Sequence, residues 1–310
     1  MKLGIALAAG AALGAAHVGV LKRLKEEGIV PDILVGASAG AMVSGIYSAG
    51  NIEEFEAIVK GREFENALLD FNSLTNKGDE AGFIAGDKLL KLLRKLTYNK
   101  NFEDVKIKTA FNAVDINTQE YIILDKGNIA DAIRASCSIP LIFKPHKIGD
   151  RYLVDGAIQD QLPIDLAKNL GADVVIAVTF NKDLIEEKYF EYENIKKYTY
   201  DIKKIAPNTV EEVIQEFPYL GQFLINNKLG KKFFEYLKIE NIKLEKVLHM
   251  LRKSLYEVNY KEADVIIAPD ITMFQSANVH KMNEIFDAGY KEADKFIKEI
   301  KKMLEIAKAR

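Results

Sequence analysis

Residues 32–50 read DILVGASAGAMVSGIYSAG, and they carry the clearest structural signal of the chain. The apolar run at 33–35 is typical of a short buried strand, and a helix of small residues follows the next five positions. Between them, Ser38 lies in a turn flanked by Gly36 and Gly40, where larger side chains would collide. A strand, a sharp turn that carries a serine, and a helix are the context that a nucleophile elbow needs. An ordinary strand-to-helix turn with a solvent-facing serine is the alternative that these five residues leave open.

The composition narrows the class of protein. The 310 residues are 48% hydrophobic and carry a net charge of −2, so we expect a large core and no nucleic-acid partner. One cysteine, Cys137, excludes an internal disulfide and favours a reducing, cytoplasmic location. Four histidines without a Cys/His cluster predict no metal site, and we expect no cofactor. No apolar run is long enough to span a membrane.

The first 50 residues predict a βαβα unit with parallel strands. Residues 2–8 are apolar on both faces, as expected of a fully buried parallel strand. A loop of small residues, 9–14, leads into an amphipathic helix over 15–27 that ends at Gly28. Because parallel strands end at the same edge of a sheet, we expect this loop and the serine turn to lie at the edge where open α/β sheets bind ligands.

The rest of the chain adds further elements and a cap within a single domain that spans 1–310. We expect helices over 52–64, 87–96, 128–136 and 281–309, and strands over 107–115, 120–124, 152–154, 172–179 and 263–269. Residues 181–260 alternate charged and aromatic side chains, which predicts an inserted helical cap. Its aromatic stretch 217–237, with nearby lysines, suits peripheral contact with a membrane surface. The alternative is an ordinary amphipathic cap that packs on the core.

A serine nucleophile needs a base, because its hydroxyl is a poor nucleophile at neutral pH. No histidine has the sequence context of an α/β-hydrolase base, and we expect His17, on the first helix, to be a packing residue. Asp155 is the better candidate, because it ends a strand and precedes Gly156, so its carboxylate can approach other loops. Burial there would raise its pKa enough for a general base, whereas an ordinary turn aspartate is the alternative.

Acyl transfer also requires amides that point at the developing oxyanion. The backbone of Ala9, Gly10 and Ala11, at the first strand-to-helix turn, can supply them. The same loop could instead bind a phosphate at the helix N-terminus. A nucleotide site is the weaker interpretation, because no acidic residue ends the second strand and no G-K-[ST] motif is present.

Four blocks of sequence together resemble the patatin-like phospholipase family, specifically its compact bacterial members. They are the first loop with AAHVGVL, the GASAG around Ser38, the RASCSIPLIF at 134–143, and Asp155-Gly156-Ala157. The resemblance implies a three-layer α/β/α fold with a central, mostly parallel sheet. It also implies a Ser38–Asp155 dyad that needs no histidine, forms an acyl-enzyme, and hydrolyses acyl esters of phospholipids, lysophospholipids, acylglycerols or small esters.

The first loop departs from the family pattern. Bacterial relatives usually read G-G-G-A-A-R-G, whereas residues 8–14 read AAGAALG, so Ala8 and Ala9 replace glycines and Leu13 replaces a cation. A displaced loop would misdirect the oxyanion amides, which predicts weakened hydrolase activity. The alternative is a non-catalytic protein of the same fold that binds acyl lipids or fatty acids. Head-group preference, positional selectivity and oligomeric state stay open.

Overall fold

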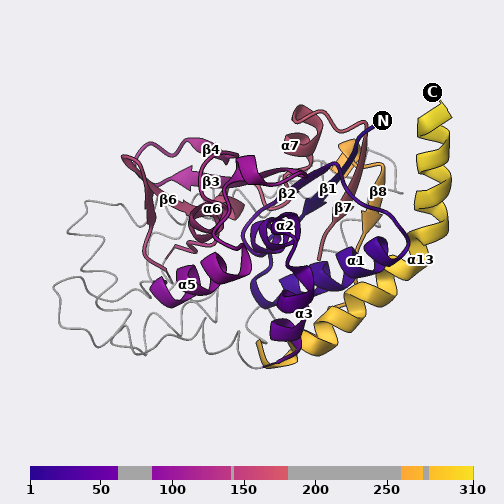
Figure 1. Ribbon diagram of the computed structural model, residues 1–310, viewed down its shortest axis with the longest axis horizontal. Coiled ribbons are helices and arrows are strands. Elements are labelled where there is room, and N and C mark those ends of the chain that lie inside the picture. Colours follow the sequence, from indigo (N-terminus) through magenta and orange to yellow (C-terminus); the bar gives the residue numbers. More distant parts are fainter. Residues whose placement is uncertain (62–85, 141–142, 181–259, 275–278, 310) are drawn as a thin grey trace, which may run out of the picture.

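One mixed, eight-stranded sheet runs through the part of the chain that the computed structural model describes (Figure 1). The described residues are 1–61, 86–140, 143–180, 260–274 and 279–309. The predicted cap over 181–260, including its aromatic stretch 217–237, lies outside them apart from Tyr260.

The centre of the sheet consists of parallel strands in the spatial order β3-β2-β1-β7-β8. Their bounds are β1 (Leu3–Leu7), β2 (Ile33–Gly36), β3 (Lys108–Asp115), β7 (Val174–Val178) and β8 (Val265–Ile267). Within this group β1 is in the middle, with β2 on one side and β7 on the other, and every one of its residues is buried. The apolar run predicted over 2–8 is therefore the central strand of the sheet.

The remaining strands are antiparallel additions beside β3. Strands β4 (Tyr121–Leu124) and β6 (Arg151–Asp155) pair with β3, and β5 (His146–Ile148) pairs with β6. The sequence did not predict β5, because its three residues read HKI and contain no apolar run or alternation.

The helices begin and end close to the predicted positions. Their bounds are α1 (Ala15–Glu26), α2 (Ala39–Ala49), α3 (Ile52–Lys60), α5 (Asp87–Leu96), α6 (Ile129–Ser136), α7 (Ile164–Asn169) and α13 (Met282–Ala309). The predicted cap of α6 is confirmed, because the Asn128 side chain accepts hydrogen bonds from the amides of Ala130 and Asp131. Helix α7 was not predicted, since its six residues are too few to establish a helical period.

Helices cover both faces of the sheet, which gives the predicted three-layer α/β/α arrangement. Alternate residues of β1 face opposite sides: Leu3, Ile5 and Leu7 join the core formed with α1, α2 and α13. Ala6 faces the other side and joins the core that contains residues of α7. The long helix α13 runs alongside α1 (Figure 1).

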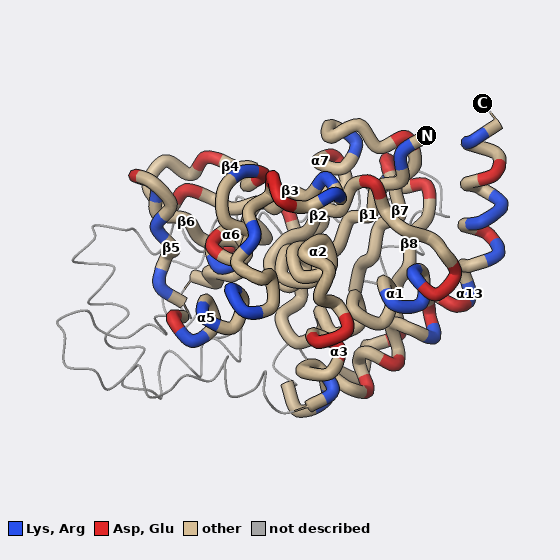
Figure 2. The backbone as a smooth tube through the Cα atoms, viewed as in Figure 1, with Lys and Arg blue, Asp and Glu red and all other residues tan. Residues whose placement is uncertain are grey.

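Charged side chains are absent from two central strands and from the helix that follows Ser38. Strands β1 and β2 and helix α2 contain no Asp, Glu, Lys or Arg, so the tube is tan there in Figure 2, whereas both signs of charge mark α3, α5 and α13. Among the described residues, no helix combines the length and the apolar character that crossing a membrane requires.

Candidate active site

Ser38 lies in the turn between β2 and α2, and its backbone is strained. Its φ of 52° and ψ of −116° belong to a region that non-glycine residues rarely adopt. The turn can be this sharp because α2 begins directly against the end of β1. A Cβ atom on Gly40 would lie 2.1 Å from the carbonyl oxygen of Leu7, and one on Gly36 would lie 2.2 Å from the backbone of Gly40. The local structure is thus that of a nucleophile elbow.

Asp155 is the last residue of β6, and its carboxylate meets Ser38. The Ser38 side chain hydrogen-bonds to this carboxylate, and the amide of Ala157 donates to Oδ1 over 2.9 Å. Both side chains are buried, with exposed fractions of 5% for Ser38 and 3% for Asp155. The fold therefore brings together the two residues that the sequence proposed as nucleophile and base. The adjacent Gly156 is packed against Asn112 of β3, where a Cβ atom would lie 2.4 Å from the Asn112 carbonyl oxygen.

The electrostatic environment of Asp155 suits proton transfer near neutral pH. Burial raises the pKa of Asp155 to about 7, although the hydrogen bonds from Ser38 and the Ala157 amide act in the opposite direction. A carboxylate with this pKa can accept a proton from a hydroxyl and return it within one catalytic cycle.

The first loop approaches the same site from β1. It forms a short 3-10 turn at Ala11–Gly14, and Gly14 is packed against Ala39, the residue after Ser38. The amide of Ala9 donates to the Gln161 carbonyl over 2.8 Å. The amides of Gly10 and Ala11 have no acceptor among the described residues. Of the three amides proposed for an oxyanion hole, these two lack an acceptor within the described part of the chain.

The backbone strain of the first loop falls on Ala11. Its φ is 49°, in the left-handed region that favours glycine. Ala8 and Ala9, where the family pattern has glycine, do not have positive φ. The strained residue of the loop is therefore Ala11, which matches the family pattern and lies two residues beyond Ala9.

The histidines within the described residues have other roles. His17 is fully buried in α1, stacks on Phe180 at 4.5 Å between ring centroids, and has Nε2 2.8 Å from the carbonyl oxygen of Ala8. Burial lowers the pKa of His17 to about 4, so the ring is neutral at pH 7 and Nε2–H donates to that carbonyl. The prediction of a packing residue is confirmed. His146 contacts Asp131 instead, His280 is exposed, and His249 lies outside the described residues.

Sequence reasoning treated residues 134–143 as a family motif and missed what three of them contact. The side chains of Ser136 and Cys137 hydrogen-bond to the backbone of Ser38, and the carbonyl of Ser138 accepts from the amide of Asp155. The only signal for these contacts was a cluster of small polar residues directly after a helix. Within the described ranges, no group of three or more His, Cys, Asp and Glu side chains is arranged to hold a metal ion.

Comparison with protein families identifies the group to which this site belongs. Residues 5–168, more than half of the chain, match the family model described as patatin-like phospholipase. The chain belongs to the patatin-like phospholipase family. The matched range contains Ser38, Asp155 and the first loop, and the family is one of lipid acyl hydrolases.

Curated relatives match the same core of the chain. An uncharacterised NTE family protein of Mycobacterium tuberculosis is 32% identical over 180 residues, which are 58% of this chain and 49% of the relative. The lysophospholipase NTE1 of Coccidioides immitis is 29% identical over 178 residues, which are 57% of this chain and 11% of that protein. The chain thus spans about half the length of the mycobacterial relative and matches a much smaller share of the fungal one.

Among solved structures, VipD of Legionella pneumophila has the same fold. The TM-score is 0.51 at 14% sequence identity, and the alignment covers 96% of this patatin-like chain and 67% of VipD. At this identity the match concerns the fold alone.

Proposed function

We propose that this patatin-like protein is a serine acyl hydrolase that cleaves carboxylic esters of lipids with a Ser38–Asp155 dyad. One observation carries the proposal: the hydroxyl of a serine in a strained elbow is hydrogen-bonded to a buried carboxylate whose pKa is about 7. The family assignment agrees with an ester of a fatty acid as substrate class.

The reaction follows from the positions of these groups. As the Ser38 oxygen attacks the ester carbonyl, its proton moves to the Asp155 carboxylate, and a tetrahedral oxyanion forms. When that species collapses, Asp155 gives the proton to the departing alkoxide, which leaves as the free alcohol, and an acyl-Ser38 ester remains. A water molecule then attacks the acyl-enzyme, and its proton passes to Asp155. Collapse of the second tetrahedral species returns that proton to the Ser38 oxygen and releases the fatty acid.

The oxyanion would be stabilised by backbone amides. Within the described ranges, the amides of Gly10 and Ala11 have no acceptor, and their loop is packed beside Ser38. The amide of Ala39, the residue after the nucleophile, is the position from which an elbow of this kind supplies a further donor. Loss of one such donor costs about 10²–10³ in kcat, so the geometry at Ala11 bears directly on the rate.

A second candidate function is a non-catalytic protein that binds acyl lipids on the same fold. The replacement of the loop cation by Leu13 and the left-handed backbone of Ala11 favour it, because both residues lie in the loop that would hold the oxyanion. Both candidate functions use the same site around Ser38, and turnover separates them.

Hydrolysis of p-nitrophenyl esters, from butanoate to dodecanoate, tests the proposal. The chain and its Ser38→Ala variant are assayed side by side, with binding of a fluorescent fatty acid measured on both. Turnover that is lost in Ser38→Ala is the expected result. Fatty-acid binding without turnover in the parent chain would instead establish the binding protein.

A further inference from the structure

The turn that follows α6, residues 136–138, contacts both members of the proposed dyad. Ser136 is the last residue of α6, and Cys137 caps the helix with ordinary backbone angles. All three residues of this 136–138 turn are buried, and Ser136 and Ser138 have no exposed surface. Their hydrogen bonds to the dyad are made mainly with backbone groups, and the Cys137 thiol also interacts with the Ser38 side chain.

Two side chains of the 136–138 turn hold the backbone of Ser38. The amide of Ser38 donates to Oγ of Ser136 over 3.0 Å, and the thiol of Cys137 donates to the carbonyl oxygen of Ser38 over 3.2 Å. In its strained conformation Ser38 belongs to neither β2 nor the regular part of α2, so its amide has no acceptor in a strand or helix. A conformation of this kind persists only where the surroundings over-determine it, and these two bonds do so.

The same turn also holds the strand that carries Asp155. The amide of Asp155 donates to the carbonyl oxygen of Ser138 over 3.0 Å. Because Ser136, Cys137 and Ser138 are consecutive, the backbone of the nucleophile and the backbone of the base are both hydrogen-bonded to the same three-residue segment. Their separation is thereby set by a turn remote from both in sequence.

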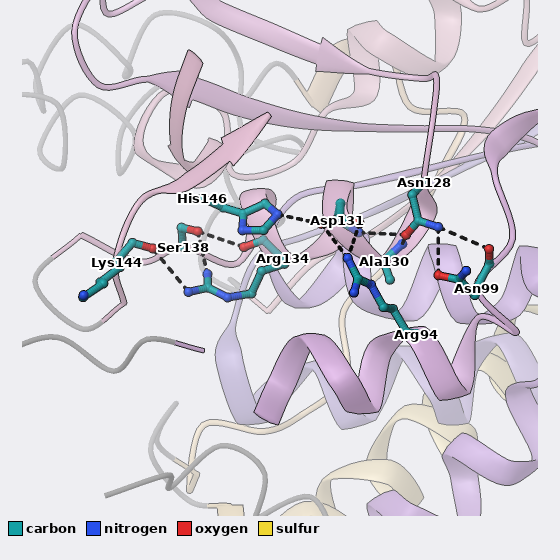
Figure 3. Close-up of polar contacts among 9 residues, drawn as sticks. All are labelled: Arg94, Asn99, Asn128, Ala130, Asp131, Arg134, Ser138, Lys144 and His146. Atoms are coloured by element: carbon teal, nitrogen blue, oxygen red, sulfur yellow. Dashed lines mark hydrogen bonds and ion pairs between the residues drawn. The ribbon is translucent and has the colours of Figure 1, made fainter. Parts of the chain in front are cut away.

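Arg134 makes further hydrogen bonds that fix the 136–138 turn. Its Nη1 donates to Oγ of Ser138 over 2.7 Å, and its Nη2 donates to the carbonyl of Lys144 over 3.2 Å, as Figure 3 shows. The Ser138 hydroxyl in turn donates to the carbonyl of Arg134 over 2.8 Å, and the guanidinium lies over the ring of Phe143. Since this arginine is 1% exposed, the cost of burying its charge makes these bonds hard to break.

We propose that the 136–138 turn is the positioning element of the active site. In this assignment Ser136 and Cys137 hold the nucleophile elbow in its strained conformation, and Ser138 ties the base to the same frame. The inference rests on the proposed Ser38–Asp155 hydrolase, and it adds positioning residues to that reaction. If the Ser38 hydroxyl and the Asp155 carboxylate are displaced by a fraction of an ångström, kcat falls. Binding of the acyl chain is unaffected by such a displacement.

The test compares variants that remove one bond with variants that keep it. Ser136→Ala removes the acceptor for the Ser38 amide, and Cys137→Ala removes the donor to the Ser38 carbonyl. Cys137→Ser keeps a donor of similar size. Ser44→Ala is the matched control, because Ser44 is also fully buried in α2 and makes one hydrogen bond, of 3.2 Å, to the Val35 carbonyl.

Four kinetic results are expected with p-nitrophenyl butanoate, one for each variant. Ser136→Ala lowers kcat about tenfold with KM unchanged, and Cys137→Ala lowers it by a smaller factor. Cys137→Ser restores most of the parent rate. Ser44→Ala leaves kcat at the parent value, although its melting temperature falls about as far as that of Ser136→Ala. An equal fall of kcat in Ser44→Ala and Ser136→Ala would overturn the inference, because any buried hydrogen bond would then have the same effect.

Amide hydrogen exchange at Ser38, followed by NMR, keeps the inference separate from the proposed hydrolase. Ser136→Ala is expected to accelerate exchange at this amide by about tenfold or more, and Ser44→Ala to leave it unchanged. If the parent chain shows no Ser38-dependent turnover, the hydrolase proposal fails, and exchange alone decides whether Ser136 holds the elbow. Unchanged exchange in Ser136→Ala would overturn the inference, as would faster exchange with an unchanged kcat in an active parent.

Discussion

At the scale of single residues, the burial of Asp155 favours its role as a base and lowers the stability of the folded protein. Its carboxyl group is buried, and burial raises its pKa to about 7. In the unfolded chain the pKa of an aspartate is about 3.9, so folding disfavours the ionised form that a general base requires. The same shift that makes proton return possible near neutral pH therefore lowers the stability of the folded, ionised protein.

The activity of the parent chain is expected to follow the ionisation of Asp155. Because the base must be deprotonated to accept the Ser38 proton, kcat/KM rises with pH and levels off above about 7. A pH series with p-nitrophenyl butanoate, corrected with Ser38→Ala for background hydrolysis, measures this. A plateau that extends unchanged down to pH 5 would contradict the assigned base. Asp155→Asn should lose activity at every pH.

Asp155→Asn should also change how stability depends on pH. Between about 4 and 7 the folded parent holds a proton that the unfolded chain has released, so its stability falls as pH rises through this window. The amide variant lacks this dependence. It is expected to exceed the parent in free energy of unfolding by about 2–4 kcal/mol at pH 8.5, and by much less at pH 5. Urea denaturation of both proteins at the two pH values measures the difference. A constant offset would show that Asp155 is not protonated in the folded state.

Ala11→Gly is expected to stabilise the protein. Ala11 has a φ of 49°, which costs an alanine about 1 kcal/mol or more and costs glycine almost nothing. Glycine also has greater conformational freedom in the unfolded chain, which offsets part of this effect. The free energy of unfolding should still rise by about 0.5–1 kcal/mol. Ala8→Gly is the control, since Ala8 is buried and has no positive φ, and it should lower stability. Equal losses in both variants would show that Ala11 is not strained.

Motifs located the reacting side chains of this site, but not the residues that hold them. Ser38 and Asp155 could be proposed from sequence because each is flanked by glycine at the end of a predicted strand. The contact of Ser38 with Ser136 joins residues 98 positions apart, and no local pattern encodes it. For the same reason the sequence could not show that the Ala9 amide is taken by the carbonyl of Gln161.

At the scale of elements, strands that are buried on both faces were predicted from the sequence, whereas a short edge strand and a short helix were not. Strands β1 and β7 are long apolar runs, because both of their faces are covered, and they were predicted. Strand β5 is half-exposed at the edge of the sheet, so its sequence carries no apolar signal. Helix α7 is stabilised by the residues that it buries against the sheet, and it is too short to display them as a period.

The packing of α13 on α1 depends on two glycines that let the helices approach closely. A Cβ atom on Gly289 would lie 2.1 Å from the carbonyl oxygen of Ala16, and one on Gly19 would lie 2.2 Å from that of Phe286. Backbone atoms cannot move away as the end of a flexible side chain can, so a methyl group here must separate the helices.

Gly289→Ala is therefore expected to lower the free energy of unfolding by about 2–3 kcal/mol, in spite of the higher helix propensity of alanine. Asn283→Ala, on the exposed side of the same helix, should change it by less than about 0.5 kcal/mol. Thermal denaturation of both variants measures the difference. A Gly289→Ala variant as stable as the parent would mean that α13 is not packed as closely as described.

At the scale of the whole molecule, the hydrophobic core includes residues that lie beyond the end of the family match. The match ends at residue 168, before β7, β8 and α13. Yet β7 pairs with β1 at the centre of the sheet, β8 extends the sheet beyond β7, and α13 buries Ile285, Phe286, Ala293 and Ile300 in the same core as α1. Removing the distal segment would expose the outer side of α1 and the edge of β7 to water.

A chain that ends at residue 180 is therefore expected to lose cooperative unfolding, even though it contains the whole family match, Ser38 and Asp155. Removal of residues 306–310 alone should leave the transition close to that of the parent, because Ile300 is the last fully buried residue of α13. Circular dichroism and intrinsic tyrosine fluorescence, recorded through urea denaturation, test both truncations. A sharp, coincident transition in the chain that ends at 180 would show that the sheet folds without β8 and α13. That result would make the distal helix an addition to a complete core, and the bonds from Ser136 and Cys137 would then hold the strained Ser38 elbow without it.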